Sequence, residues 1–146
     1  MRSVLILILS IFLIGCGGDK KSNSGLPKEK SKAEKNWSTN KGVGPISNIE
    51  LSAIDVTQVE KGRKLYKSKC VACHKTNTSK LIGPGLGGVT KRRTPEWIMN
   101  MTMVPQKMIK EDPLAKEVYE TYRTPMLDLG IKEKEAREIL EYLRTL

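Results

Sequence analysis

Apolar residues divide the chain into three zones. They form a nearly unbroken run over residues 4–14, become sparse from residue 17 to about residue 45, and then recur at helical spacing from residue 51 onward. The first run follows Arg2 and is shorter than the about 20 apolar residues that a membrane-spanning helix needs. A basic start, a short apolar stretch and small residues after it are typical of a secretory signal peptide. The sequence therefore predicts an exported protein.

The third zone has the spacing of helices, and no segment alternates as a half-buried strand would. Asp55 and Thr57 are candidate N-caps for a first helix that runs to Cys70. Val59, Leu65 and Tyr66 lie on its expected buried face. This pattern predicts an all-α domain.

Further helices follow along the chain. Thr94 as N-cap and Pro95 at the first helical position predict a middle helix, which should stop before Pro105. A shorter helix is expected around residues 114–122, and a last helix from about residue 132 to residue 144. The fold class is therefore all-α with three to four helices, and a glycine-rich loop at residues 82–88 lies between the first two.

The middle zone is rich in Lys, Ser, Gly and Asn, and it carries too little apolar surface to offset the entropy cost of ordering. We expect residues 16–50 to be a flexible tether and residues 51–146 to be the folded domain. The alternative is that Trp37 and Ile46 dock on the domain and order part of this segment.

The end of the first apolar run, Leu-Ile-Gly-Cys at residues 13–16, resembles the lipobox of bacterial lipoproteins. The resemblance implies that residues 1–15 are a signal peptide cut before Cys16. The thiol of Cys16 would then carry diacylglycerol and its new amine an acyl chain, which together anchor a protein stably. The alternatives are a plain secretory signal cut nearby and an uncleaved anchor.

The charge is strongly basic, with a formal net charge of +10. A basic exported protein is suited to anionic lipid or to the acidic face of another protein. Nucleic acid is not an expected partner outside the cytoplasm.

Cys70, Cys73 and His74 form the motif Cys-Val-Ala-Cys-His directly after the first expected helix. Two thiols three residues apart can each add to one vinyl group of a single haem, and the next histidine is then held under the iron as an axial ligand. A thioredoxin-like thiol pair would need a βαβ setting, and a zinc site would need about four protein ligands. The motif therefore predicts one covalently attached haem c.

The second axial position cannot be filled by another histidine of this chain, because His74 is the only one. Methionine, lysine, the amino terminus or an open site remain, and methionine raises the reduction potential of a histidine-ligated haem. We favour Met126, which follows Pro125 in a loop before the last helix and can turn inward without bending a helix. The remaining methionines are expected to fill gaps in the core, with a copper-binding cluster as a third possibility: Met99, Met101, Met103 and Met108.

The first and last helices resemble those of class I cytochromes c, and the likeness extends over roughly residues 59–146. The resemblance implies that the last helix crosses the first closely at Gly62. Tyr66, four residues later, would then pack into the crossing, and the partners on the last helix would be Ile139, Tyr142 and Leu143.

The loop at residues 82–88 resembles the family loop in which a proline carbonyl accepts a hydrogen bond from the ring of the axial histidine. The resemblance implies that the carbonyl of Pro84 accepts from His74, which fixes the tautomer and raises the basicity of the ligand. Met126 precedes the last helix, as the family's second ligand does.

A narrower resemblance joins residues 91–97, with the later Asp112-Pro113, to small lipoprotein cytochromes that accompany bacterial nitrous-oxide reduction. It implies that Trp97 lies near the haem and donates its indole N–H to a propionate, and that Arg92 or Arg93 pairs with one. The alternatives are a core tryptophan and solvated arginines.

These features predict an electron carrier rather than an enzyme. Its expected partners are exported redox proteins, meaning a reductase, an oxidase or a quinol-oxidising complex, and the membrane through the lipid anchor. The location would be the periplasmic side of the bacterial cell envelope, on the inner or the outer membrane. The alternative is a haem enzyme or gas sensor with an open sixth site, for which the chain has no second histidine. The lysines expected around the haem edge would steer docking: Lys67, Lys69, Lys75 and Lys80.

Overall fold

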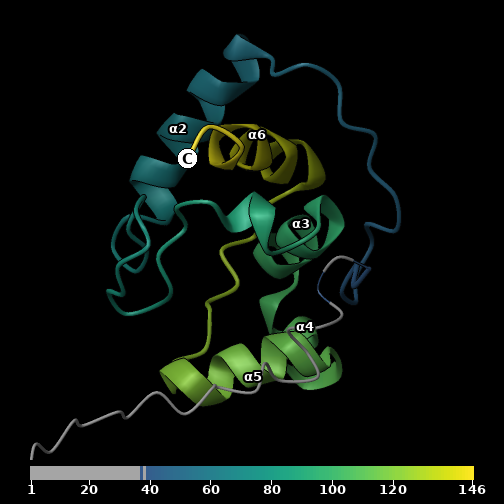
Figure 1. Ribbon diagram of the computed structural model, residues 1–146, viewed down its shortest axis with the longest axis vertical. Helices are drawn as coiled ribbons and strands as arrows, with labels where there is room; N and C mark the ends of the chain where they lie inside the picture. Colours follow the sequence, from purple (N-terminus) through teal and green to yellow (C-terminus); the bar gives the residue numbers. More distant parts are fainter. Residues whose placement is uncertain (1–36, 38) are drawn as a thin grey trace, which may run out of the picture.

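The computed structural model describes residue 37 and residues 39–146. The expected signal peptide, Cys16 and most of the expected tether lie outside the described residues. The described part is helical and contains no strand, as predicted, and Figure 1 shows its arrangement. Its elements are α2 (Val56–Lys69), the short 3-10 helix η1 (Val89–Lys91), α3 (Pro95–Met103), α4 (Pro105–Glu111), α5 (Pro113–Tyr122) and α6 (Glu133–Leu143). None of the helices among these residues is long and apolar enough to cross a membrane.

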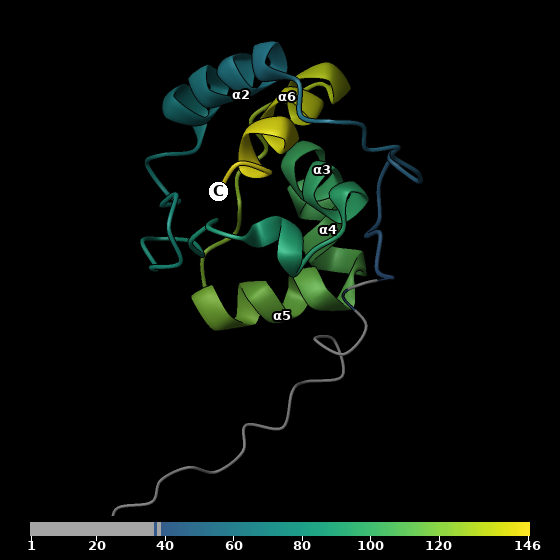
Figure 2. The same ribbon diagram turned by 45° about the horizontal axis from the view of Figure 1, so that its top comes forward.

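Helix α2 begins where the sequence predicted. The carboxylate of Asp55 accepts the backbone N–H groups of Thr57 and Gln58, so Asp55 is the N-cap and Thr57 lies inside the helix. Val59 and Tyr66 are buried against α6, which crosses α2 closely in both ribbon views (Figures 1 and 2).

The crossing of α2 and α6 is centred on Gly62. A Cβ atom at this position would lie 2.5 Å from the carbonyl carbon of Glu138 and 3.0 Å from Cβ of Tyr142. The rings of Tyr66 and Tyr142 pack beside it, with their centroids 5.3 Å apart. The close crossing implied by the family resemblance is therefore present.

Helices α3, α4 and α5 each begin with a proline, at Pro95, Pro105 and Pro113. Helix α3 ends before Pro105, as predicted, but α4 was not expected and starts at that same residue. A proline ends the preceding helix because it lacks the N–H group and restricts the residue before it. It can also occupy the first helical position, where no N–H is required. Pro105 thus ends α3 and begins α4, and only Val104 lies between the two helices.

The packed domain begins earlier than the sequence predicted. Residues 40–54, which we call the N-terminal strap, run along the side of α3 and α6 to the start of α2 (Figure 2). Ile46 is 5 % exposed and belongs to the core. The buried side chain of Asn100 accepts the N–H of Ile46 at 3.0 Å and donates to the carbonyl of Ile46 at 2.8 Å. The boundary at residue 51 is therefore too late, and the docking of Ile46 is the correct alternative.

Charged side chains hold the strap at two further points. Glu96, on α3, accepts the N–H of Ile49 at 3.1 Å and pairs with Lys41 at 3.3 Å. Burial acts to raise the pKa of Glu96, but hydrogen bonds and Lys41 outweigh it, so the pKa lies below its usual 4.5. At the other end, Arg144 bridges the buried Glu141 and the carbonyl of Ser52. The strap is therefore part of the folded domain.

Candidate haem site

A cavity of about 580 Å³ lies between the C-terminal end of α2, the glycine-rich loop, α3 and the segment that joins α5 to α6. Its walls are mainly apolar. Helices α5 and α6 and the 3-10 helix η1 also contribute, and the apolar lining side chains include Tyr66, Ile82, Leu86, Val89, Ile98, Val118, Leu127, Ile139 and Leu143. A large apolar group is the type of ligand that such walls favour.

The two thiols and the histidine of the Cys-x-x-Cys-His motif all line this cavity. Cys70 is the C-cap of α2, and its carbonyl accepts the N–H groups of Cys73 at 3.0 Å and His74 at 2.9 Å. This tight turn brings both thiols, which are free and half-buried, to one wall. Burial raises the pKa of the Cys70 thiol.

His74 is held by its ring and by its backbone. Its Nδ1 lies 2.8 Å from the carbonyl oxygen of Pro84, the contact that the family resemblance implied. With Nδ1 donating to that carbonyl, Nε2 carries the free lone pair and is the nitrogen that can bind a metal. The hydroxyl of Tyr66 donates to the carbonyl of His74. Burial of this hydroxyl raises the pKa of Tyr66.

The loop that carries Pro84 has no space for larger residues beside the histidine. A Cβ atom on Gly83 would lie 2.6 Å from Cε1 of His74, so a side chain there would displace the ring. Arg92 fixes the next turn of the loop, because its guanidinium donates to the carbonyls of Gly85 and Gly87, each at 2.6 Å. The sequence missed this role for Arg92, since nothing in a linear pattern indicates which carbonyls an arginine will reach.

Trp97 lines the cavity, but its indole N–H is not available to a propionate. It donates to the buried carboxylate of Asp112 at 3.0 Å. The predicted propionate contact of Trp97 is therefore wrong, and the buried core interpretation is correct. Arg93 lies over the Trp97 ring at 5.2 Å, and Asp112 also caps α5 by accepting the N–H of Ala115.

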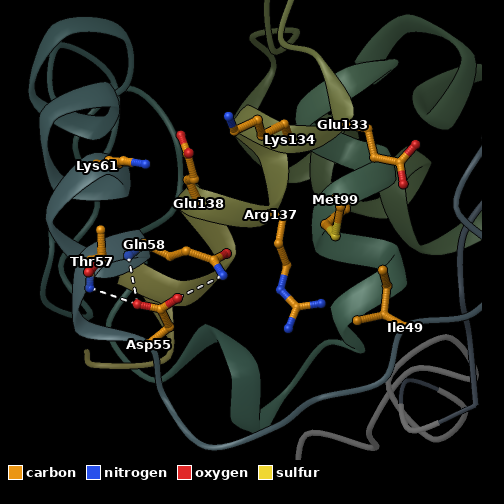
Figure 3. Close-up of a pocket in the computed structure, with 10 residues that line it drawn as sticks. All are labelled: Ile49, Asp55, Thr57, Gln58, Lys61, Met99, Glu133, Lys134, Arg137 and Glu138. Atoms are coloured by element: carbon orange, nitrogen blue, oxygen red, sulfur yellow. Dashed lines mark hydrogen bonds between the residues drawn. The ribbon is translucent and has the colours of Figure 1, made fainter.

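Only two of the five methionines in the described residues line the cavity, namely Met126 and Met101. Met108 is fully buried elsewhere, where its sulfur accepts the N–H of Val43 at 3.0 Å. Met99 faces a separate groove between the N-terminal strap, α2 and α6, which shares no residue with the cavity (Figure 3). These positions agree with core filling for Met99 and Met108.

Exposed apolar side chains and one exposed lysine line the cavity, and a second lysine lies beside it. Ile82, Leu127 and Leu129 line it and remain 36–63 % exposed. Lys69 also lines it, and the amine of Lys80 lies 5.2 Å from the centroid of the Tyr122 ring. The four lysines singled out in the sequence are all exposed: Lys67, Lys69, Lys75 and Lys80.

The donor set of the cavity fits a covalently bound haem. Two thiols, an oriented imidazole and the side chains of two methionines lie on the walls of one mainly apolar chamber. A zinc site would need about four ligands, and the described residues contain no group of three or more His, Cys, Asp and Glu side chains placed to hold a metal ion. The chemistry of the walls therefore matches the cofactor predicted from the motif.

Comparison with known proteins agrees with this assignment. The cytochrome c family matches residues 59–146. A cytochrome c-553-like protein of Synechocystis is 26 % identical over 87 residues, which cover 60 % of this chain and 68 % of that protein.

Two solved structures have the same fold. A cytochrome c from Rhodothermus marinus is 37 % identical, with a TM-score of 0.69 over 77 % of this chain and 95 % of its own. The cytochrome c domain of a Pseudomonas putida protein is 28 % identical, with a TM-score of 0.51 over 57 % of this chain and 85 % of its own. The chain thus belongs to the cytochrome c family, and it is a mono-haem electron-transfer protein with covalently bound haem c.

Proposed function

We propose that the protein is a membrane-tethered carrier that passes single electrons between exported redox partners of a respiratory chain. The observation that carries the proposal is the wall of the cavity, where both thiols, His74 and Met126 face the same chamber. Cys70 and Cys73 would hold the haem through thioethers, with Nε2 of His74 and the sulfur of Met126 as axial ligands. The bound haem supplies a one-electron Fe(II)/Fe(III) couple.

Two protein ligands would make this a carrier and not an enzyme, because substrates and gases are then kept from the metal. The surrounding side chains support the same conclusion. Pro84 orients His74, and the mainly apolar walls of the chamber disfavour water around a bound haem. A site whose ligands stay in place in both oxidation states needs little reorganisation when an electron arrives or leaves.

The opening of the cavity is the proposed docking surface. Ile82, Leu127 and Leu129 offer apolar contact, while the exposed lysines around them attract an acidic partner. A reductase, an oxidase or a quinol-oxidising complex with an acidic face fits this surface. The resemblance of residues 91–97 favours a nitrous-oxide reductase as the terminal acceptor.

Charge reversal tests the docking surface. We expect Lys69→Glu with Lys75→Glu to lower the rate of oxidation of the reduced protein by hexacyanoferrate(III) on the order of tenfold at low salt, because the local positive field is lost. The effect should fade as ionic strength rises. The matched control is Lys61→Glu with Lys134→Glu, which changes the same net charge in the separate groove (Figure 3). An equal loss in the control would show that net charge, and not this surface, steers the reaction.

Lipid attachment at Cys16 is the proposed tether. It would raise the concentration of the carrier at the membrane where its partners lie. We expect Cys16→Ala, expressed as the full chain, to move the haem protein from the membrane fraction to the soluble periplasmic fraction. Membrane association that persists in this variant would overturn the lipid anchor while leaving the haem site unaffected.

A further inference from the structure

The segment that presents Met126 to the cavity has little support of its own. Residues 123–132 join α5 to α6 without regular structure, and the side chains of most of residues 123–130 are exposed. Within this segment, which we call the ligand loop, the N–H of Gly130 is satisfied locally by Asp128. Arg123 ends α5 in a left-handed conformation and donates its N–H to Tyr119. None of these contacts restrains Met126.

One hydrogen bond connects the ligand loop to another helix in the part of the chain described by the structure. Nε2 of Gln106 donates to the carbonyl oxygen of Met126 at 2.8 Å. The acceptor belongs to the backbone of the methionine itself. The bond therefore restrains the backbone of the methionine that lines the cavity.

Gln106 is carried on a firmly held element. It is the second residue of α4 and directly follows the buried Pro105, while its own side chain is exposed. Met108 of the same helix is fully buried and accepts the N–H of Val43, which ties α4 to the N-terminal strap. A donor on such a support can restrain a loop that has no other cross-link of this kind.

We propose that Gln106 is a positioning residue that keeps Met126 in the cavity and so keeps the sixth coordination position closed. The inference rests on the proposed role of Met126 as axial ligand. A restrained backbone loses less conformational entropy when its sulfur binds, which favours the closed state. An outside ligand competes only for the open fraction, so its apparent affinity reports that fraction.

The test is imidazole binding to the ferric holoprotein, measured by the loss of the weak near-red sulfur-to-iron band. Gln106→Glu keeps the size of the side chain but removes the donor. We expect imidazole to bind about threefold to tenfold more tightly in this variant, the factor that one hydrogen bond controls. Gln106→Arg, which retains N–H donors, should bind imidazole nearly as weakly as the native protein. Arginine is preferred to lysine because a deprotonated amine can itself bind iron.

Two controls separate the possible results. Lys107→Ala changes the neighbouring exposed residue of α4 and should leave the imidazole affinity unchanged. If Gln106→Glu binds imidazole as the native protein does, or no more tightly than Lys107→Ala, Gln106 has no positioning role, and Met126 remains the proposed ligand. If the near-red band survives in Met126→Ala, the ligand assignment fails and this inference fails with it.

Discussion

Replacing Met126 by alanine should abolish the near-red sulfur-to-iron band of the ferric protein while the haem stays covalently attached. The thioethers depend on Cys70 and Cys73, which this substitution does not alter. The reduction potential should fall by on the order of 0.1 V or more, because axial ligands set haem potentials over about 0.8 V and methionine raises them. Optical spectra and a redox titration of the purified variant measure both effects.

The control for this prediction is Met101→Ala. Met101 is the other methionine on the wall of the cavity, but it lies on α3, where its direction is fixed by the helix. We expect this variant to retain the band and most of the potential. A band that disappears in Met101→Ala and persists in Met126→Ala would reverse the assignment of the ligand.

Replacing Gly62 by alanine should cost about 3 kcal/mol of unfolding free energy, at the upper end of what overpacking usually costs. The added methyl group would meet the backbone of Glu138, which cannot rotate away as a side chain can. Helices α2 and α6 would have to separate, which loosens the contact between Tyr66 and Tyr142. The loss should exceed the gain of up to about 1 kcal/mol that alanine brings to a helix interior. Denaturant unfolding followed by helical circular dichroism gives the value.

Gly130→Ala serves as the comparison. Gly130 also has to accept a Cβ atom, but no atom lies within 4 Å of that position, and only its positive φ of 65° opposes the change. We expect a loss of about 1 kcal/mol there. Equal stability of Gly62→Ala and the native protein would mean that the crossing can accommodate a side chain.

The residues whose role depends on local spacing could be predicted from the sequence. Cys70, Cys73 and His74 follow one another within a single turn, so their chemistry can be inferred without a fold. Asp55 marked the start of α2, and Thr94 with Pro95 marked the start of α3, because capping is a local property. The contact between His74 and Pro84 came from the family resemblance and is present at 2.8 Å.

The residues whose role depends on distant partners could not be predicted in the same way. Trp97 and Asp112 are 15 positions apart, and only packing brings the indole to the carboxylate. The docking of Ile46 depends on Asn100, 54 residues away, which satisfies both polar groups of its backbone. The polar composition of this segment predicted a tether. The segment packs nonetheless, because one buried side chain supplies its hydrogen bonds and few apolar residues are then needed.

Helix α4 shows how a correct local rule can still leave an element out. Pro105 was correctly placed as the end of α3, but the same residue can also open a helix. The seven residues of α4 are too few for a periodic apolar pattern to stand out, and the buried face depends mainly on Pro105 and Met108. This short helix matters because it carries Gln106 to the ligand loop.

The optical spectrum of the native holoprotein tests the closed His74/Met126 site most directly. The ferric form should show the near-red sulfur-to-iron band, and the reduced form should not bind carbon monoxide readily at neutral pH. A ferric protein without that band, whose reduced form binds carbon monoxide readily, would contradict the account and indicate an open sixth site instead of an electron carrier.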